Sequence, residues 1–202
     1  YILLQEDWLI NQSGLTRNDP TNMQRAFSQA AASGKKIVFI PGCLTANISQ
    51  SVSSCASDIG QGLDIAKNYW GNISMIMFDE PNINKTAMES FITGFNSIVS
   101  SKGLSLKPIG VNFTESQILN NTGYQASNMA EVGFEAYMDP AMQNDPNLVA
   151  NLNNKINQLK AKIGNKPMFI VLQGYDRNGA WTNMNTLLSI QTPVYLKAYN
   201  DS

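Results

Sequence analysis

The chain has 202 residues, of which 43% are hydrophobic and 14% are charged, and its formal net charge is −1. At this length we expect one sizeable hydrophobic core and a single domain over residues 1–202. The near-neutral charge argues against a nucleic acid partner, because phosphate binding needs a basic face, and no run of about 18 apolar residues is present to span a membrane.

The hydrophobic pattern alternates between helical and strand periodicity along the chain. Residues 2–4 are a candidate first strand. A turn at residues 18–21 then opens a helix that Gly34 ends, because apolar side chains recur at helical spacing up to that glycine. Residues 36–40 (KIVFI) are apolar and β-branched and are closed by a Pro-Gly pair, which is typical of a strand buried on both faces.

The same helix-and-strand unit recurs through the rest of the sequence. The clearest later helix covers residues 86–101, whose apolar side chains lie on one stripe. The predicted helices are 58–69, 86–101, 115–119, 147–163 and 180–189, and the predicted strands are 73–78, 108–113, 132–137, 167–172 and 194–198.

Six well-supported strands and a seventh candidate, separated by helices, predict a parallel α/β sheet, because parallel strands need crossover connections. We expect a parallel (β/α)8 TIM-type barrel that is compact or lacks N-terminal βα units, since a closed barrel usually needs about 250 residues. A doubly wound open parallel sheet is the alternative. No strand, however, is followed by the Gly-rich phosphate loop of that fold.

Histidine is absent, which excludes Ser-His-Asp and Cys-His catalysis and histidine-ligated metals. We therefore expect no metal and no cofactor. Any chemistry has to rest on carboxylates, tyrosines, amides or lysines.

Such side chains are concentrated after the predicted strands, at the carboxyl ends where parallel barrels have their active sites. Many hydrogen-bonding groups and a proton donor suit a carbohydrate partner. The candidate catalytic residues are Glu80, Glu135 and Asp139, and the candidate substrate-binding residues are Asn112, Tyr137, Gln173, Tyr175, Lys197 and Tyr199.

Strand alternation assigns faces to these side chains. Phe78 and Glu80 share one face, so Asp79 points outward as a structural cap if Glu80 faces inward. The structural alternative for Glu80 is a cap or a salt bridge. Glu135 lies in an otherwise apolar strand, where an unpaired carboxylate would be costly. For Lys197 the alternative is a solvated loop lysine.

The order of strand endings resembles that of family 18 chitinases and chitinase-like lectins. Residues 73–80 (ISMIMFDE) stand where their Asp-x-x-Asp-x-Asp-x-Glu strand presents the catalytic acid, which implies that role for Glu80. Residues 132–140 (VGFEAYMDP) are similar to their sixth strand, and residues 194–201 (VYLKAYND) resemble their closing strand. Phe78 and Lys197 replace the aspartate and the tryptophan that this family uses in substrate-assisted catalysis.

Residues 79–81 (DEP) also resemble the Asn-Glu-Pro of retaining glycosidases in the clan that includes cellulases. That resemblance implies an acid/base at Glu80 and a nucleophile three strands later, where this chain has Gln173. It therefore indicates an inactive variant unless Glu135 is the second carboxylate.

Cys43 and Cys55 are predicted to form a disulfide, with two free thiols as the alternative. Six Asn-X-Ser/Thr sequons begin at Asn11, Asn47, Asn72, Asn84, Asn112 and Asn120. Together with the low charge they favour an extracellular or cell-surface protein.

Two functions remain open. The first is a secreted or cell-surface glycoside hydrolase with Glu80 as the acid. The second is a catalytically inactive barrel that serves as a glycan-binding or surface structural module. A Schiff-base enzyme that uses Lys197 is a distant third, and the sequence leaves the oligomeric state open.

Overall fold

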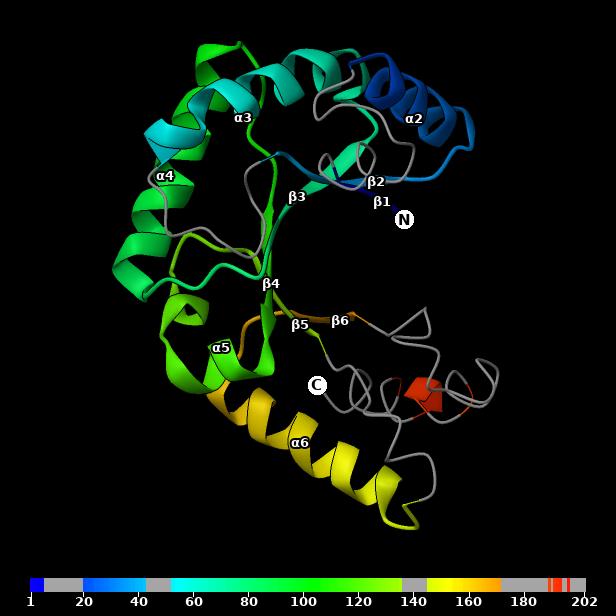
Figure 1. The fold of residues 1–202 in the computed structure, drawn as a ribbon, viewed down its shortest axis with the longest axis vertical. Coiled ribbons are helices and arrows are strands. Elements are labelled where there is room, and N and C mark those ends of the chain that lie inside the picture. Colours follow the sequence, from blue (N-terminus) through cyan, green and yellow to red (C-terminus); the bar gives the residue numbers. More distant parts are fainter. Residues whose placement is uncertain are drawn as a thin grey trace.

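The computed structural model describes residues 1–5, 20–42, 52–135 and 145–171, together with residues 189, 191–193 and 196. Strands and helices alternate along the described chain (Figure 1). Among these residues, no helix has the length and hydropathy that crossing a membrane requires. The strands are β1 (Ile2–Gln5), β2 (Ile37–Ile40), β3 (Ile73–Asp79), β4 (Ile109–Thr114), β5 (Glu131–Glu135) and β6 (Met168–Val171).

The helices follow the strands in the predicted order. α4 begins after the N-cap Asn84, whose side chain accepts a hydrogen bond from Ala87 N. Such a cap satisfies a backbone donor that the first turn leaves unpaired. The helices are α2 (Pro20–Ala32), α3 (Val52–Ala66), α4 (Lys85–Ser101), α5 (Glu115–Asn120) and α6 (Leu148–Ile163), with 3-10 turns η1 (Lys67–Tyr69) and η2 (Gly123–Gln125).

All six strands form one parallel sheet in the order β1-β2-β3-β4-β5-β6. Each crossover therefore advances in the same direction, and right-handed crossovers of that kind place every helix on one side of the sheet. Figure 1 shows this arrangement, with α2 to α6 forming an outer arc around the strands. The described chain is thus a partial (β/α) barrel. The doubly wound alternative is wrong, because its strand order would reverse within the sheet.

The predicted strand at residues 194–198 is wrong at Leu196, its one described residue. Leu196 lies in the middle of the predicted strand 194–198 but is helical, as are residues 191–193. The apolar run there is only a few residues long, and short apolar runs do not distinguish helix from strand by periodicity. The rest of that run lies outside the described residues.

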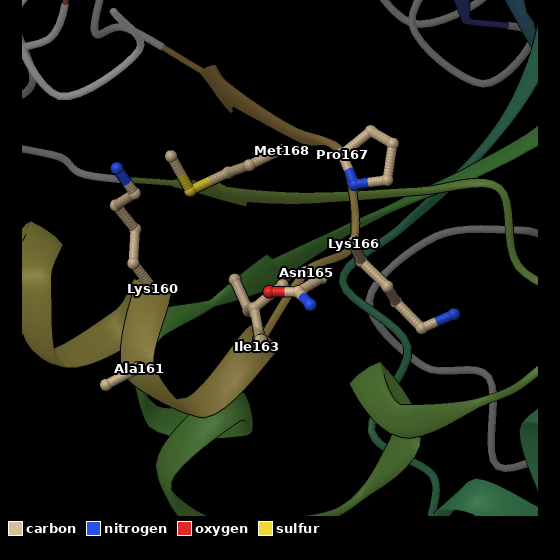
Figure 2. A pocket seen from close by; sticks show the side chains of 8 residues that line it. Lys160, Ala161, Ile163, Asn165, Lys166, Pro167 and Met168 are labelled. Atoms are coloured by element: carbon tan, nitrogen blue, oxygen red, sulfur yellow. The ribbon is translucent and has the colours of Figure 1, made fainter. Parts of the chain in front are cut away.

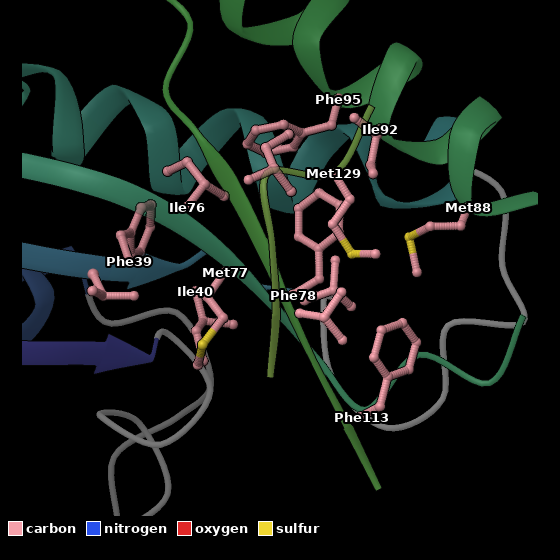
Figure 3. Close-up of a cluster of buried hydrophobic side chains, with 14 of the residues drawn as sticks. Phe39, Ile40, Ile76, Met77, Phe78, Met88, Ile92, Phe95, Phe113 and Met129 are labelled. Carbon is pink, nitrogen blue, oxygen red and sulfur yellow. The ribbon is translucent and has the colours of Figure 1, made fainter. Parts of the chain in front are cut away.

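The hydrophobic core lies between the sheet and the helices. Phe39 of β2, Phe78 of β3 and Phe113 of β4 are fully buried on the helix side of the sheet. Figure 3 shows Phe39 and Phe78 in this layer together with Phe95 of α4. This packing fixes which face of each strand points inward and therefore which polar side chains meet at the site.

The inner face of the sheet is buried on its central strands and more exposed on the edge strands β1 and β6. Leu3 of β1 is 50% exposed, and Phe169 of β6 is half-buried. Gly133 of β5 makes room for the Phe169 ring, because a Cβ at Gly133 would clash with carbons of that ring. The absence of a side chain at Gly133 thus lets the Phe169 ring approach the neighbouring strand β5.

Candidate functional site

The carboxyl ends of β3, β4 and β5 bring three polar side chains into contact. Asp79, the last residue of β3, is paired in register with Asn112 of β4. Asn112 Nδ2 donates one hydrogen bond to Asp79 Oδ1 at 2.9 Å and another to Glu135 Oε1 at 3.1 Å. We name these three residues the carboxyl cluster.

Asn112 is the buried centre of the carboxyl cluster, with 1% of its surface exposed. Its carbonyl oxygen, Oδ1, is buried without a hydrogen-bond partner, whereas its amide nitrogen serves both carboxyl groups. An unpaired buried acceptor costs free energy. The fold therefore holds this amide in the orientation in which its nitrogen donates to both carboxyl groups.

Asp79 has a perturbed ionisation. Burial raises the pKa of the Asp79 carboxyl above its usual value of 3.8, the hydrogen bond from Asn112 acts in the opposite direction, and the negative charge of Glu80 raises the pKa further. Glu80 directly follows Asp79 in the chain, and its side chain is half-buried.

Glu80 has a left-handed backbone conformation with φ of 49°. This conformation is uncommon for a residue other than glycine, and it precedes Pro81. Two hydrogen bonds hold it: Glu80 N donates to Asn112 O at 2.8 Å, and Gln117 Nε2 of α5 donates to Glu80 O at 2.7 Å. Strained backbone that is fixed from both sides is frequent at functional sites.

The outward direction predicted for Asp79 is wrong. The Phe78 ring packs edge-on against Phe91 and Phe95 of α4, with each pair of ring centroids 5.4 Å apart. Phe78 therefore faces the helices, and Asp79 faces Asn112 and Glu135 on the inner side. The strand alternation of side-chain directions does not extend to Glu80, because the extended backbone ends at the left-handed conformation of that residue.

Gln117 is a site residue that sequence analysis did not identify. Thr114 and Gln117 form a capping box at the start of α5, in which the Gln117 side chain accepts from Thr114 N. The same side chain donates to Glu80 O. The Thr-x-x-Gln pattern of residues 114–117 was the available signal, because this pattern typically begins a helix.

Most of the remaining predicted residues lie outside the described part of the chain. Cys55 is fully buried near the start of α3. Its disulfide with Cys43 stays a prediction, because Cys43 lies outside the described residues. The other predicted site residues outside the described part of the chain are Tyr137, Asp139, Gln173, Tyr175, Lys197 and Tyr199.

A pocket of about 620 Å³ lies at the other end of the sheet. It is lined by the end of α6 and the start of β6, including Lys160, Lys166 and Met168. Figure 2 shows the two lysine side chains pointing away from each other. The pocket is at the amino end of β6, whereas the carboxyl cluster lies at the carboxyl ends of its neighbours. Within the described residues, no group of three His, Cys, Asp or Glu side chains could hold a metal ion.

Solved structures with the same architecture are glycoside hydrolases. An exo-β-1,4-mannosidase from Opitutaceae bacterium strain TAV5 matches 98% of this chain with a TM-score of 0.65 and 10% identity. The catalytic domain of a mannanase from Streptomyces sp. SirexAA-E matches 95% of the chain with a TM-score of 0.55 and 11% identity. This chain spans 44% and 62% of the lengths of those two chains.

At such low identity the likeness shows the fold alone, which is that of a partial (β/α) barrel. It does not single out family 18. No protein family model matches the sequence, and no curated protein matches it either.

Proposed function

We propose that this chain is a glycoside hydrolase-like protein that acts on a poly- or oligosaccharide at the carboxyl ends of β3, β4 and β5. The observation that carries the proposal is the carboxyl cluster, in which one amide binds two carboxyl groups at the end of a parallel sheet and Glu80 follows Asp79 in the chain. Acid catalysis of glycosidic cleavage needs two carboxyl groups, one that donates a proton and one that acts as base or nucleophile.

In this proposal Glu80 is the proton donor and Glu135 is the second carboxylate, with Asp139 as the other candidate for that role. Glu80 follows β3 and is held by its backbone to β4 and α5. Glu135 ends β5, two strands along, on the face that also carries Asp79. Tyr137, Gln173, Tyr175, Lys197 and Tyr199 are the proposed saccharide contacts.

The substrate class to test first is β-1,4-linked mannan, because the two similar structures are a β-1,4-mannosidase and a mannanase. The proposed setting is extracellular or at the cell surface. The low charge and the sequons support that setting.

The decisive variant is Glu80→Gln, which keeps the shape of the side chain and removes the acid. We expect hydrolysis of β-1,4-manno-oligosaccharides to fall by about 100-fold or more, which is the usual contribution of a general acid. Glu131→Gln is the matched control, because Glu131 lies on the same face at the amino end of β5 and should leave turnover unchanged. Unchanged hydrolysis by the Glu80 variant would remove Glu80 from the mechanism.

A catalytically inactive glycan-binding module is the second candidate. Gln173 supports it, because an amide stands where the Asn-Glu-Pro resemblance implies a glutamate nucleophile. Saturable binding of manno-oligosaccharides without any turnover by the wild-type chain would favour this function over hydrolysis.

A further inference from the structure

Gln117 contacts both the start of its own helix, α5, and the residue that we propose as the proton donor. Its side-chain oxygen Oε1 accepts a hydrogen bond from Thr114 N at 2.8 Å, and its side-chain nitrogen Nε2 donates to Glu80 O at 2.7 Å. A backbone N–H can only donate and a backbone carbonyl can only accept, so the orientation of the Gln117 amide is unambiguous. One side chain therefore serves two partners through two different atoms.

The backbone conformation of Glu80 needs such a partner. Its φ of 49° is uncommon for a residue other than glycine, and a residue before proline prefers extended conformations with negative φ. The sequence at Glu80 and Pro81 thus opposes the conformation that the residue has. Contacts from other elements have to hold it there.

Two hydrogen bonds fix the peptide groups on either side of the Glu80 Cα. Glu80 N donates to Asn112 O at 2.8 Å, which ties the preceding peptide group to β4. Gln117 Nε2 ties the following peptide group to α5. Because peptide groups are planar, these two ties fix φ and ψ of Glu80 and with them the direction in which its Cα–Cβ bond leaves the chain. Loss of the Gln117 donor would release one of the two peptide groups.

The loop that follows Glu80 has its own contacts with the segment after α5. Asn121 Nδ2 donates to Asn82 Oδ1 at 3.2 Å, and Lys85 N donates to Thr122 Oγ1 at 3.1 Å. These contacts do not involve the Gln117 side chain. A change at that side chain should therefore turn Glu80 without releasing the rest of the loop.

We propose that Gln117 is a positioning residue for Glu80, in which Nε2 sets the direction of the Glu80 side chain and Oε1 has the separate role of capping α5. The assignment rests on the proposed function for the role of Glu80 as proton donor. A proton donor works only within hydrogen-bond reach of the leaving oxygen, so a misdirected carboxyl group lowers kcat. Binding of the saccharide through other residues does not depend on that reach, so KM should change little.

Substitutions of Gln117 separate the two roles. Gln117→Glu keeps an acceptor for Thr114 N, as in the common Thr-x-x-Glu capping box, but has no donor for Glu80 O. Gln117→Lys has a donor for Glu80 O but no acceptor for Thr114 N. Gln117→Met has neither and introduces no charge. Gln158→Glu on the exposed face of α6 is the control, because it adds the same charge as Gln117→Glu on a different helix.

The first measurement is NMR spectroscopy of the folded chain and needs no substrate. Cα and Cβ chemical shifts report the backbone conformation of each residue. We expect Glu80 to lose its left-handed shifts in Gln117→Glu and Gln117→Met and to keep them in Gln117→Lys. The helical shifts of residues 115–120 should be kept in Gln117→Glu and weakened in Gln117→Lys. Left-handed shifts at Glu80 in all three variants would overturn the proposal.

The second measurement is hydrolysis of β-1,4-manno-oligosaccharides by each variant at its own pH optimum. We expect kcat to fall at least about tenfold in Gln117→Glu and Gln117→Met, with little change in KM, and to stay within about threefold of wild type in Gln117→Lys. Gln158→Glu should retain the wild-type kcat. Loss of kcat in Gln117→Lys but not in Gln117→Glu would make Gln117 a helix cap only. Equal loss in both, or loss in neither, would also contradict the positioning role.

The two proposals fail separately. Loss of the left-handed shifts of Glu80 in Gln117→Glu, in a chain that cleaves no glycan, would preserve the hold of Gln117 on Glu80 and remove the hydrolase function. Unchanged Glu80 shifts in all Gln117 variants of an active enzyme would do the reverse.

Discussion

The backbone of Glu80 links the strain of a single residue to the proposed activity. A non-glycine residue in the left-handed region is about 1–2 kcal/mol less stable than in the right-handed region, and Glu80 has φ of 49°. Glycine has no such cost, although it loses more chain entropy on folding. The strain at Glu80 therefore suggests a position selected for the side chain and not for stability.

We predict that Glu80→Gly stabilises the protein by roughly 0.5–1 kcal/mol while it removes the proposed proton donor. Urea unfolding measures the first effect, and hydrolysis of manno-oligosaccharides measures the second. Glu80→Gln is the control, since it keeps the Cβ and should leave the free energy of unfolding almost unchanged. A destabilised glycine variant would show that the left-handed turn is not strained.

The pKa of Asp79 gives a prediction for stability against pH. Burial raises this pKa above 3.8, so Asp79 contributes stability that is fully present below that value and is lost as the pH rises through the folded-state pKa. Asp79→Asn has no such loss, because the amide that replaces the carboxyl stays neutral. The free energy of unfolding of the variant relative to wild type should therefore increase from acid toward neutral pH. A difference that is constant with pH, measured by urea unfolding, would contradict the raised pKa.

The identity of the site residues was predictable from sequence only in part. Asn112, Glu80 and Glu135 were identified because polar side chains at the ends of apolar strands are conspicuous. The direction of the Asp79 side chain was not predicted correctly, because it depended on whether Phe78 faced the helices or the barrel interior. That choice is made by the packing of Phe78 against α4, which no local pattern encodes.

At the scale of elements, α5 is short but supports the site directly. Its capping box joins Thr114 to Gln117, and Gln117 also holds Glu80 O. The isolated six-residue helix would be unstable in water, because helix nucleation is costly. Its stability therefore comes from its cap and from Ile118, which is fully buried.

We predict that Thr114→Val destabilises the protein by about 1 kcal/mol, because valine keeps the shape but cannot accept the hydrogen bond from Gln117 N. Chemical unfolding provides the measurement. Ser97→Ala on the exposed face of α4 is the control and should change stability by less than about 0.5 kcal/mol. A loss no larger than that of the control would mean that the cap does not hold α5.

The pattern of apolar residues predicted most elements correctly because their periodicity is sustained. α4 and α6 differ from the predicted bounds by one residue at one end each. The predicted strand 194–198 was wrong at Leu196, where the run is short and a helix and a strand bury similar side chains. The equally short predicted strands at residues 2–4 and 36–40 are correct, so a short apolar run is compatible with either structure and only tertiary packing decides between them.

At the scale of the molecule, the two faces of the parallel sheet carry different kinds of side chain. The helices cover the outer face, while the inner face keeps Leu3 half-exposed and carries the carboxyl cluster at one end. Sequence predicted the parallel sheet and its helices but not how far the barrel closes, because closure depends on the tilt and stagger of the strands.

The central claim is that a saccharide binds at the carboxyl ends of β3, β4 and β5. The most direct test is an NMR titration of the chain with β-1,4-manno-oligosaccharide, followed through the backbone amides. We predict that saturable shifts will be centred on Glu80, Asn112 and Glu135. Shifts confined to the pocket around Lys160 and Met168 at the opposite end of the sheet, or no shifts at all, would contradict the account.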